Sequence, residues 1–205
     1  MTRVPRSFNG AAREQAFANL GLLLFVVDAR GTPERGKAFQ DVVYKNVGRN
    51  EILDHVAVLK QLAAARPYVD MSRVALFGGS FGGYFAVRGL LQEPDVFQVG
   101  IAMAPINDVS QGYRTWMGSP EENQEGYDFA SNLRMAGNLK GRLLLIHGTS
   151  DVNAPFAESI RLIDALERAG KPYDLVLLPE QGHAAQNSMY SLQAVKRYLV
   201  EHLKP

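Results

Sequence analysis

Short, unbroken apolar runs recur along this sequence, and longer amphipathic segments separate them. Apolar runs without alternation are typical of strands that are covered on both faces, as in parallel sheets. Strand and helix patterns alternate to the end of the chain, which indicates an α/β fold with an open, doubly wound, mainly parallel sheet. We predict about five strands, at residues 22–28, 74–77, 99–102, 143–146 and 175–178.

Helical patterns fill most of the intervals between these runs. The longer predicted helices cover residues 11–20, 52–65, 156–169 and 188–203, and another starts near Phe81. Residues 107–139 lack a clear period, so we expect short helices and loops there, at the carboxyl edge of the sheet. No linker or repeat interrupts the 205 residues, which predicts a single domain over residues 1–205.

Composition and charge exclude several classes of protein. Lys and Arg number 22 against 21 Asp and Glu, and a net charge of +1 gives no field to attract nucleic acid or a membrane surface. Cysteine is absent, which excludes disulfides and thiolate chemistry. No apolar run approaches the roughly 18 residues of a membrane span. No signal peptide is visible, which favours the cytoplasm, while the composition leaves the cytosol and the periplasm both open.

The strongest local signal is the segment G-G-S-F-G-G at residues 78–83, between an apolar run and a helical pattern. The glycines two residues before and two residues after Ser80 permit a sharp strand-to-helix turn that exposes its hydroxyl. The backbone N–H of Phe81 then lies at the helix start, where it can donate to an oxyanion. A phosphate-binding loop would need Lys and Ser or Thr where Tyr84 and Phe85 stand, so we interpret Ser80 as a nucleophile.

A serine nucleophile requires a base and an acid that orients the base. His183 follows the last predicted strand and Asp151 follows the strand before it, so both lie at carboxyl ends, as Ser80 does. Asp174 precedes its strand, and Glu180 shares the loop of His183, which makes both of them poorer acids. We therefore predict that Ser80, Asp151 and His183 form a catalytic triad.

The remaining histidines have simpler interpretations. His55 and His202 lie in helical patterns, and we expect His147, which ends a strand, to be buried and to donate to the backbone. No two histidines stand four residues apart, so we predict no metal site, and a hydrolase of this type needs no cofactor. We interpret Asp28 and Arg30 as a structural ion pair that braces the loop after the first predicted strand.

These motifs resemble the catalytic domain of the prolyl oligopeptidase family of serine peptidases, and most closely its dipeptidyl peptidase IV branch. The resemblance covers nearly the whole chain and implies an N-terminally truncated α/β-hydrolase fold. It implies that Ser80 is the nucleophile, Asp151 the acid and His183 the base. The segments that carry it are residues 28–32, 78–84, 104–105, 117–118, 147–153 and 182–183.

The same resemblance implies a substrate pocket. Asn153 matches a family residue that contacts a substrate carbonyl, and Tyr84 would line the pocket for the residue before the scissile bond. Tyr113 and Trp116 are further candidates for this pocket, although the loop that carries them is shorter than is usual in the family.

Two features of the family are missing from the sequence. Family members carry a β-propeller before the hydrolase domain, and that domain begins with further strands and a loop whose tyrosine is the second oxyanion donor. One missing strand would lie between residues 22–28 and 74–77, so both runs lose a partner. Three outcomes are open: the two runs pair directly, a second copy fills the gap in a homo-oligomer, or the 205 residues are a piece of a longer gene product.

The sequence thus predicts a serine hydrolase that cleaves acyl bonds, including peptide bonds after proline, through an acyl-enzyme. Two alternatives remain open. A chain with only the Phe81 N–H as oxyanion donor would be a slow peptidase, which favours a small-ester carboxylesterase. The other alternative is a catalytically inactive remnant that keeps the hydrolase fold.

Overall fold

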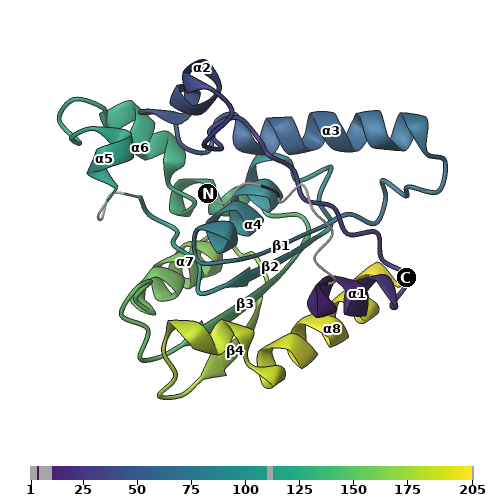
Figure 1. Ribbon diagram of the computed structural model, residues 1–205. Helices are drawn as coiled ribbons and strands as arrows, with labels where there is room; N and C mark the ends of the chain where they lie inside the picture. The colour runs from purple at the N-terminus through teal and green to yellow at the C-terminus, as the bar shows by residue number, and fades with distance from the viewer. Residues whose placement is uncertain (1–3, 5–10, 110–112, 205) are drawn as a thin grey trace.

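The computed structural model describes residue 4, residues 11–109 and residues 113–204. The sheet in these residues has four parallel strands in the order β1-β2-β3-β4 (Figure 1). The predicted α/β class with a parallel sheet is confirmed, and so are four of the five predicted strands. Their bounds are Ala75–Gly79 for β1, Val99–Met103 for β2, Arg142–Gly148 for β3 and Asp174–Leu178 for β4.

Helices connect the strands and cover the sheet. Within the described residues, no helix is long and apolar enough to cross a membrane. In the described part of residues 107–139 lie the short helices α5 (Arg114–Met117), α6 (Gln124–Ala130) and η2 (Leu133–Asn138), as expected from the missing period. The helices are α1 (Ala12–Ala18), α2 (Lys37–Gln40), η1 (Asp41–Val43), α3 (Glu51–Ala65), α4 (Phe81–Gln92), α5 (Arg114–Met117), α6 (Gln124–Ala130), η2 (Leu133–Asn138), α7 (Ala157–Arg168), η3 (His183–Asn187) and α8 (Met189–Leu203).

The sheet lies between two layers of helices, because successive side chains of a strand point to opposite faces. On β3, Leu143 and Leu145 pack in one apolar cluster with side chains of α3, α4 and α7. Leu144 and Ile146 pack in a second cluster with side chains of α1 and α8. All four side chains are almost completely buried, which explains why the strand reads as an unbroken apolar run.

The prediction of a strand at residues 22–28 is wrong. The segment is drawn as a plain coil after α1 in Figure 1, and Leu23 and Val26 are 62% and 67% exposed. A strand exists only where a neighbouring edge takes up its backbone hydrogen bonds. In the described part of the chain, β1 pairs with β2 alone, so direct pairing of the two runs is also wrong. A second copy in the gap and a longer gene product stay predictions.

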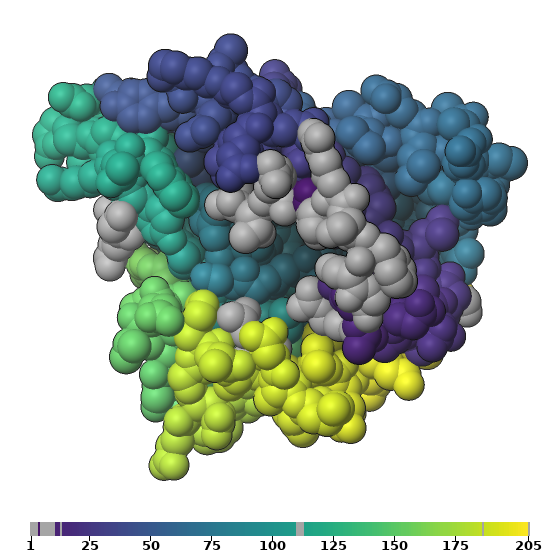
Figure 2. Space-filling model, viewed as in Figure 1, coloured from purple at the N-terminus to yellow at the C-terminus, as the bar shows by residue number. Residues whose placement is uncertain are grey.

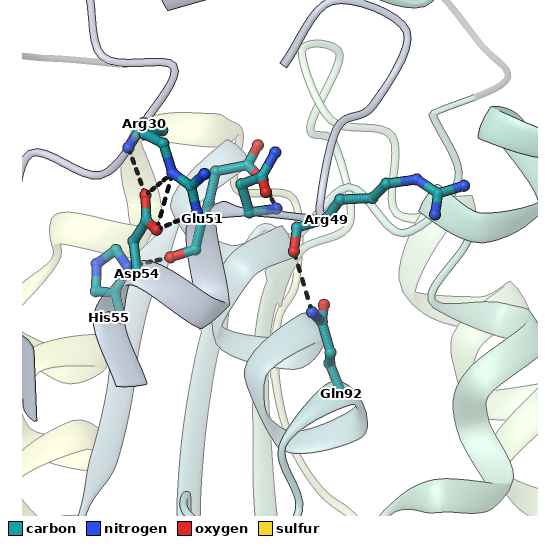
Figure 3. Close-up of polar contacts among 7 residues, drawn as sticks. Arg30, Arg49, Glu51, Asp54, His55 and Gln92 are labelled. Atoms are coloured by element: carbon teal, nitrogen blue, oxygen red, sulfur yellow. Dashed lines mark hydrogen bonds and ion pairs between the residues drawn. The ribbon is translucent and has the colours of Figure 1, made fainter. Parts of the chain in front are cut away.

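Arg30 fastens the segment after this run to helix α3 (Figure 3). Its backbone N–H donates to Asp54 Oδ2 at 2.8 Å, and its Nε lies 3.0 Å from both carboxylate oxygens of Asp54. Burial raises the pKa of Asp54, but the hydrogen bonds from Arg30 outweigh burial and leave the pKa below its ordinary value. Asp28 forms its ion pair with Arg35, at 3.2 Å. The predicted ion pair between Asp28 and Arg30 is therefore wrong: each of the two side chains forms an ion pair with a different residue.

Candidate active site

Ser80 lies in a strained turn between β1 and α4. Its φ and ψ angles are 57° and −120°, and its backbone N–H donates to Met103 O at 2.8 Å. A side chain at position 78 would not fit, because a Cβ there would lie 2.3 Å from Gly82 O. Positive φ at a residue other than glycine costs about 1–3 kcal/mol and persists where the surroundings enforce it, often at functional sites. The turn therefore has the local geometry predicted for an exposed nucleophile.

The Phe81 N–H is suited to bind an oxyanion. Phe81 is the first residue of α4, and the first N–H groups of a helix have no acceptor within the helix. The positive end of the helix dipole lies at the same place. An oxygen that becomes negative beside Ser80 would therefore meet a free backbone donor.

Asp151 and His183 form the hydrogen-bonded pair predicted from their order in the chain. His183 Nδ1 lies 2.7 Å from Asp151 Oδ2. The other carboxylate oxygen, Oδ1, accepts the backbone N–H groups of Asn153 at 2.9 Å and Ala154 at 3.0 Å. The Asp151 side chain is fully buried, whereas that of His183 is 20% exposed.

The electrostatics favour an ionised Asp151. Burial raises its pKa, but hydrogen bonds from the Ala154 N–H, the His183 ring and the Asn153 N–H outweigh burial. The net effect holds the pKa of Asp151 below the ordinary value of an aspartate. The carboxylate is therefore charged at neutral pH, and it can orient His183 and stabilise its protonated form.

Three hydrogen bonds fix the loop of Asp151 against the loop of His183. The N–H of Thr149 donates to Leu178 O at 3.1 Å, and the N–H of Ser150 donates to Gln181 O at 3.0 Å. In return, the N–H of Glu180 donates to Thr149 Oγ1 at 2.8 Å. The loops that follow β3 and β4 therefore form one unit, which holds the acid and the base together.

Two rival acids lie elsewhere. Asp174 begins β4, at the opposite end of the strand from the candidate site, and accepts a hydrogen bond from Tyr198 at 2.7 Å. Glu180 contributes its backbone to the loop contacts described above. Asp151 is the carboxylate in contact with His183, as predicted.

Ser80, Asp151 and His183 follow the carboxyl ends of β1, β3 and β4, which share one edge of the parallel sheet. Asp151 and His183 are in contact. Among the described residues, no hydrogen bond joins Ser80 Oγ to His183. Catalytic hydrogen bonds of this kind are often long in free enzymes and tighten when substrate binds.

An aromatic cluster begins next to Ser80. The Phe81 ring lies 5.8 Å from the ring of Tyr113, 5.4 Å from Trp116 and 5.5 Å from Tyr84, measured between centroids. Trp116 is 42% exposed, whereas Tyr84 is fully buried and donates its hydroxyl to Ala130 O at 2.9 Å. Tyr84 therefore lies behind the Phe81 ring, away from solvent, which is not the position expected of a residue that lines the substrate pocket. Phe81 and Tyr113 are half-buried, and Trp116 is exposed.

Helix α5, which carries Trp116, is held from a distant part of the sequence. The Lys45 N–H donates to Trp116 O at 2.7 Å, and Asn123 Nδ2 donates to Lys45 O at 3.0 Å. Figure 2 shows the green-teal region of α5 and α6 against the indigo region around residue 45.

Asn153, the predicted carbonyl contact, is exposed beside Asp151.

His147 is buried and bound to the backbone, as the sequence suggested, and it also lies close to Asp151. It is buried, and its Nε2 lies 2.8 Å from Ala154 O, as expected for a donor to the backbone. The same Nε2 lies 3.5 Å from Asp151 Oδ2, a proximity that the sequence analysis missed. The four-residue spacing between His147 and Asp151 was the available signal. Within the described ranges, no group of three or more potential ligands could hold a metal ion.

A strained serine between a parallel strand and a helix, with an Asp–His pair on later loops of the same edge, defines the α/β-hydrolase class of folds. A sequence model of the prolyl oligopeptidase family matches residues 7–205. The chain therefore belongs to the prolyl oligopeptidase family, a family of serine peptidases.

Similar proteins are dipeptidyl peptidases. Dipeptidyl peptidase 8 of Homo sapiens is 37% identical over 202 residues, which are 93% of this chain and 22% of the relative. A probable dipeptidyl-aminopeptidase B of Emericella nidulans is 36% identical over 88% of this chain and 21% of the relative. The crystal structure of Porphyromonas gingivalis dipeptidyl peptidase 4 matches with a TM-score of 0.80 and 32% identity, over 86% of this chain and 26% of that chain. The chain thus spans about a fifth of the length of its curated relatives.

Proposed function

We propose that this chain is a serine peptidase domain that cleaves peptide bonds through an acyl-enzyme on Ser80. The observation that carries the proposal is the 2.7 Å hydrogen bond between Asp151 and His183 at the sheet edge where the strained Ser80 turn also lies. Membership of a serine peptidase family and the similarity to dipeptidyl peptidases support it.

In the proposed reaction, His183 accepts the proton of Ser80. His183 Nδ1–H donates to Asp151, which leaves Nε2 to take the proton as Ser80 Oγ attacks the substrate carbonyl. The Phe81 N–H stabilises the oxyanion, and His183 Nε2 then returns its proton to the leaving amine. A water molecule releases the acyl group in the same way, with His183 as base and Ser80 as leaving group. This route requires Ser80 and His183 to close to hydrogen-bond distance when substrate binds.

We further propose that the residue before the scissile bond is proline. A pyrrolidine ring is compact and apolar, and it packs well on aromatic faces. Phe81, Tyr113 and Trp116 supply such faces directly beside Ser80. Asn153, exposed beside Asp151, is available to donate to a substrate carbonyl.

Three substrates or probes test this function together: a dipeptide anilide ending in proline, p-nitrophenyl acetate and a fluorophosphonate. We expect turnover of the anilide and a fluorophosphonate adduct on Ser80, and loss of both in Ser80→Ala. Turnover of the ester without the anilide would instead favour a carboxylesterase. A folded protein that forms no adduct would favour an inactive remnant.

A further inference from the structure

Asp151 faces a second histidine besides His183. His147, the last residue but one of β3, has a fully buried side chain, and its Nε2 lies 3.5 Å from Asp151 Oδ2. The mechanism proposed above gives this buried imidazole no role. Burial of a titratable ring beside a buried carboxylate is costly unless its hydrogen bonds are satisfied, so its partners decide what it does.

The partners of His147 fix its tautomer. Ala154 O, 2.8 Å from Nε2, is a carbonyl oxygen and can only accept, so Nε2 carries the proton. In the neutral ring Nδ1 is then an acceptor, and it accepts a hydrogen bond from the hydroxyl of Ser159, whose Oγ lies 2.8 Å away. Burial lowers the pKa of His147, which favours the neutral ring that this pattern requires.

Ala154 links His147 to the Asp151–His183 pair through two successive hydrogen bonds. Its Nε2–H holds the carbonyl of Ala154, and the N–H of the same residue donates to Asp151 Oδ1 at 3.0 Å. Asp151 Oδ2 in turn binds His183. The imidazole also supports the loop from within, because its ring packs edge-on against Phe156 at 5.5 Å between centroids.

We propose that His147 is a positioning residue that aims the Asp151 carboxylate at His183 by holding the Ala154 carbonyl. The Nε2–H group does this work by fixing the 151–154 turn, whose Ala154 N–H donates to Asp151 Oδ1. The kinetic consequence rests on the proposed function, since it requires hydrolysis at Ser80. The structural consequence, the geometry of the Asp151–His183 bond, does not.

Gln and Met are matched replacements for this test. Both side chains are similar in length, but the Gln amide can donate to Ala154 O from near the Nε2 position, whereas Met has no donor. We expect His147→Gln to keep kcat within about threefold of the unchanged protein. His147→Met lowers kcat by about 10- to 100-fold with KM changed by less than about twofold, because a displaced carboxylate weakens the base rather than substrate binding.

Proton NMR supplies a readout that does not depend on substrate. The His183 Nδ1–H bound to Asp151 should give a far-downfield signal in the unchanged protein and in His147→Gln, and in His147→Met it should move upfield or broaden. A folded His147→Met protein with unchanged kcat and an unchanged signal would overturn the proposal. If no anilide or ester is hydrolysed, the proposed function fails while the NMR comparison still decides this inference.

A measurement on the unchanged protein covers the case in which His147→Met does not fold. Nitrogen-15 NMR of the His147 ring reports which nitrogen carries the proton. The proposal requires a neutral ring protonated at Nε2 at pH 7. A neutral ring protonated only at Nδ1 has no donor for the Ala154 carbonyl and would overturn the proposal. A doubly protonated ring would contradict the neutral tautomer that the proposal requires.

Discussion

Replacing Asp151 by Asn tests the acid in the candidate triad with little disturbance of the fold. The Asn side chain keeps an oxygen at the place of Oδ1, so it can still accept the N–H groups of Asn153 and Ala154, now 2.9 and 3.0 Å away. At the place of Oδ2 it presents an NH₂ group to His183 Nδ1, now 2.7 Å from the carboxylate. Two donors cannot face each other, so Nδ1 must become the acceptor and the ring proton must move to Nε2.

The size of the effect follows from that change of tautomer. A histidine protonated at Nε2 cannot take the Ser80 proton, and the corresponding change in another serine peptidase lowers kcat by about 10⁴. At about 1.36 kcal/mol for each factor of ten, the barrier rises by about 5.4 kcal/mol. We therefore expect Asp151→Asn to lower kcat on a prolyl anilide by about 10⁴, with KM nearly unchanged.

The assay is steady-state hydrolysis of the anilide, with thermal unfolding to verify that the variant is folded. Asp174→Asn is the matched control, because Asp174 begins β4 at the far end of the strand and binds Tyr198. It should keep kcat within about twofold. A folded Asp151→Asn protein that loses less than tenfold in kcat would refute the tautomer argument.

Three further predictions concern stability. Gly78→Ala should lower the free energy of unfolding by about 1–3 kcal/mol, because its Cβ would lie 2.3 Å from Gly82 O. Gly82→Ala, with nothing within 4 Å of its Cβ, should leave the free energy of unfolding unchanged or raise it. Equal losses for the two variants in chemical denaturation would contradict this prediction. Ser188→Ala should lower the free energy of unfolding by about 1 kcal/mol and Tm by about 2–4 °C, because Ser188 Oγ accepts the Ser191 N–H at the start of α8. An unchanged Tm would show that this N-cap contributes nothing to stability. The pKa of Asp151 is lower in the folded chain than the roughly 3.9 of an unfolded one, so its stabilisation is present above about pH 4 and is lost as the pH falls through the folded pKa. The stability advantage over Asp151→Asn should therefore shrink between pH 7 and pH 3 in urea titrations, and an advantage that grows would have the wrong sign.

The two central strands of the sheet could be predicted from the sequence because they are buried on both faces. Residues 99–102 and 143–146 lie between two helical layers, so apolarity alone identifies them. Residues 22–28 are just as apolar, yet they form no strand. Whether an apolar run becomes a strand depends on a partner edge elsewhere in the chain, which a local pattern does not contain.

The candidate site likewise has parts that the local sequence predicts and parts that depend on distant segments of the chain. The Ser80 turn is a local structure, and glycines at fixed offsets predict it. The partnership of Asp151 and His183 follows from strand order, since parallel strands bring their carboxyl ends together. The burial of Tyr84 depends on how residues 124–130 fold over it, which side-chain type and spacing did not reveal. A backbone acceptor was expected for His147, but the sequence did not show that it would be the carbonyl of Ala154.

The central claim is that Ser80, His183 and Asp151 act together, and a crystal structure of the fluorophosphonate adduct tests it most directly. We predict a covalent bond from Ser80 Oγ to phosphorus. His183 Nε2 should lie within about 2.6–3.2 Å of Ser80 Oγ, and Nδ1 should remain bound to Asp151. An adduct on Ser80 with the His183 ring outside hydrogen-bond distance, or an adduct on another residue, would contradict the account.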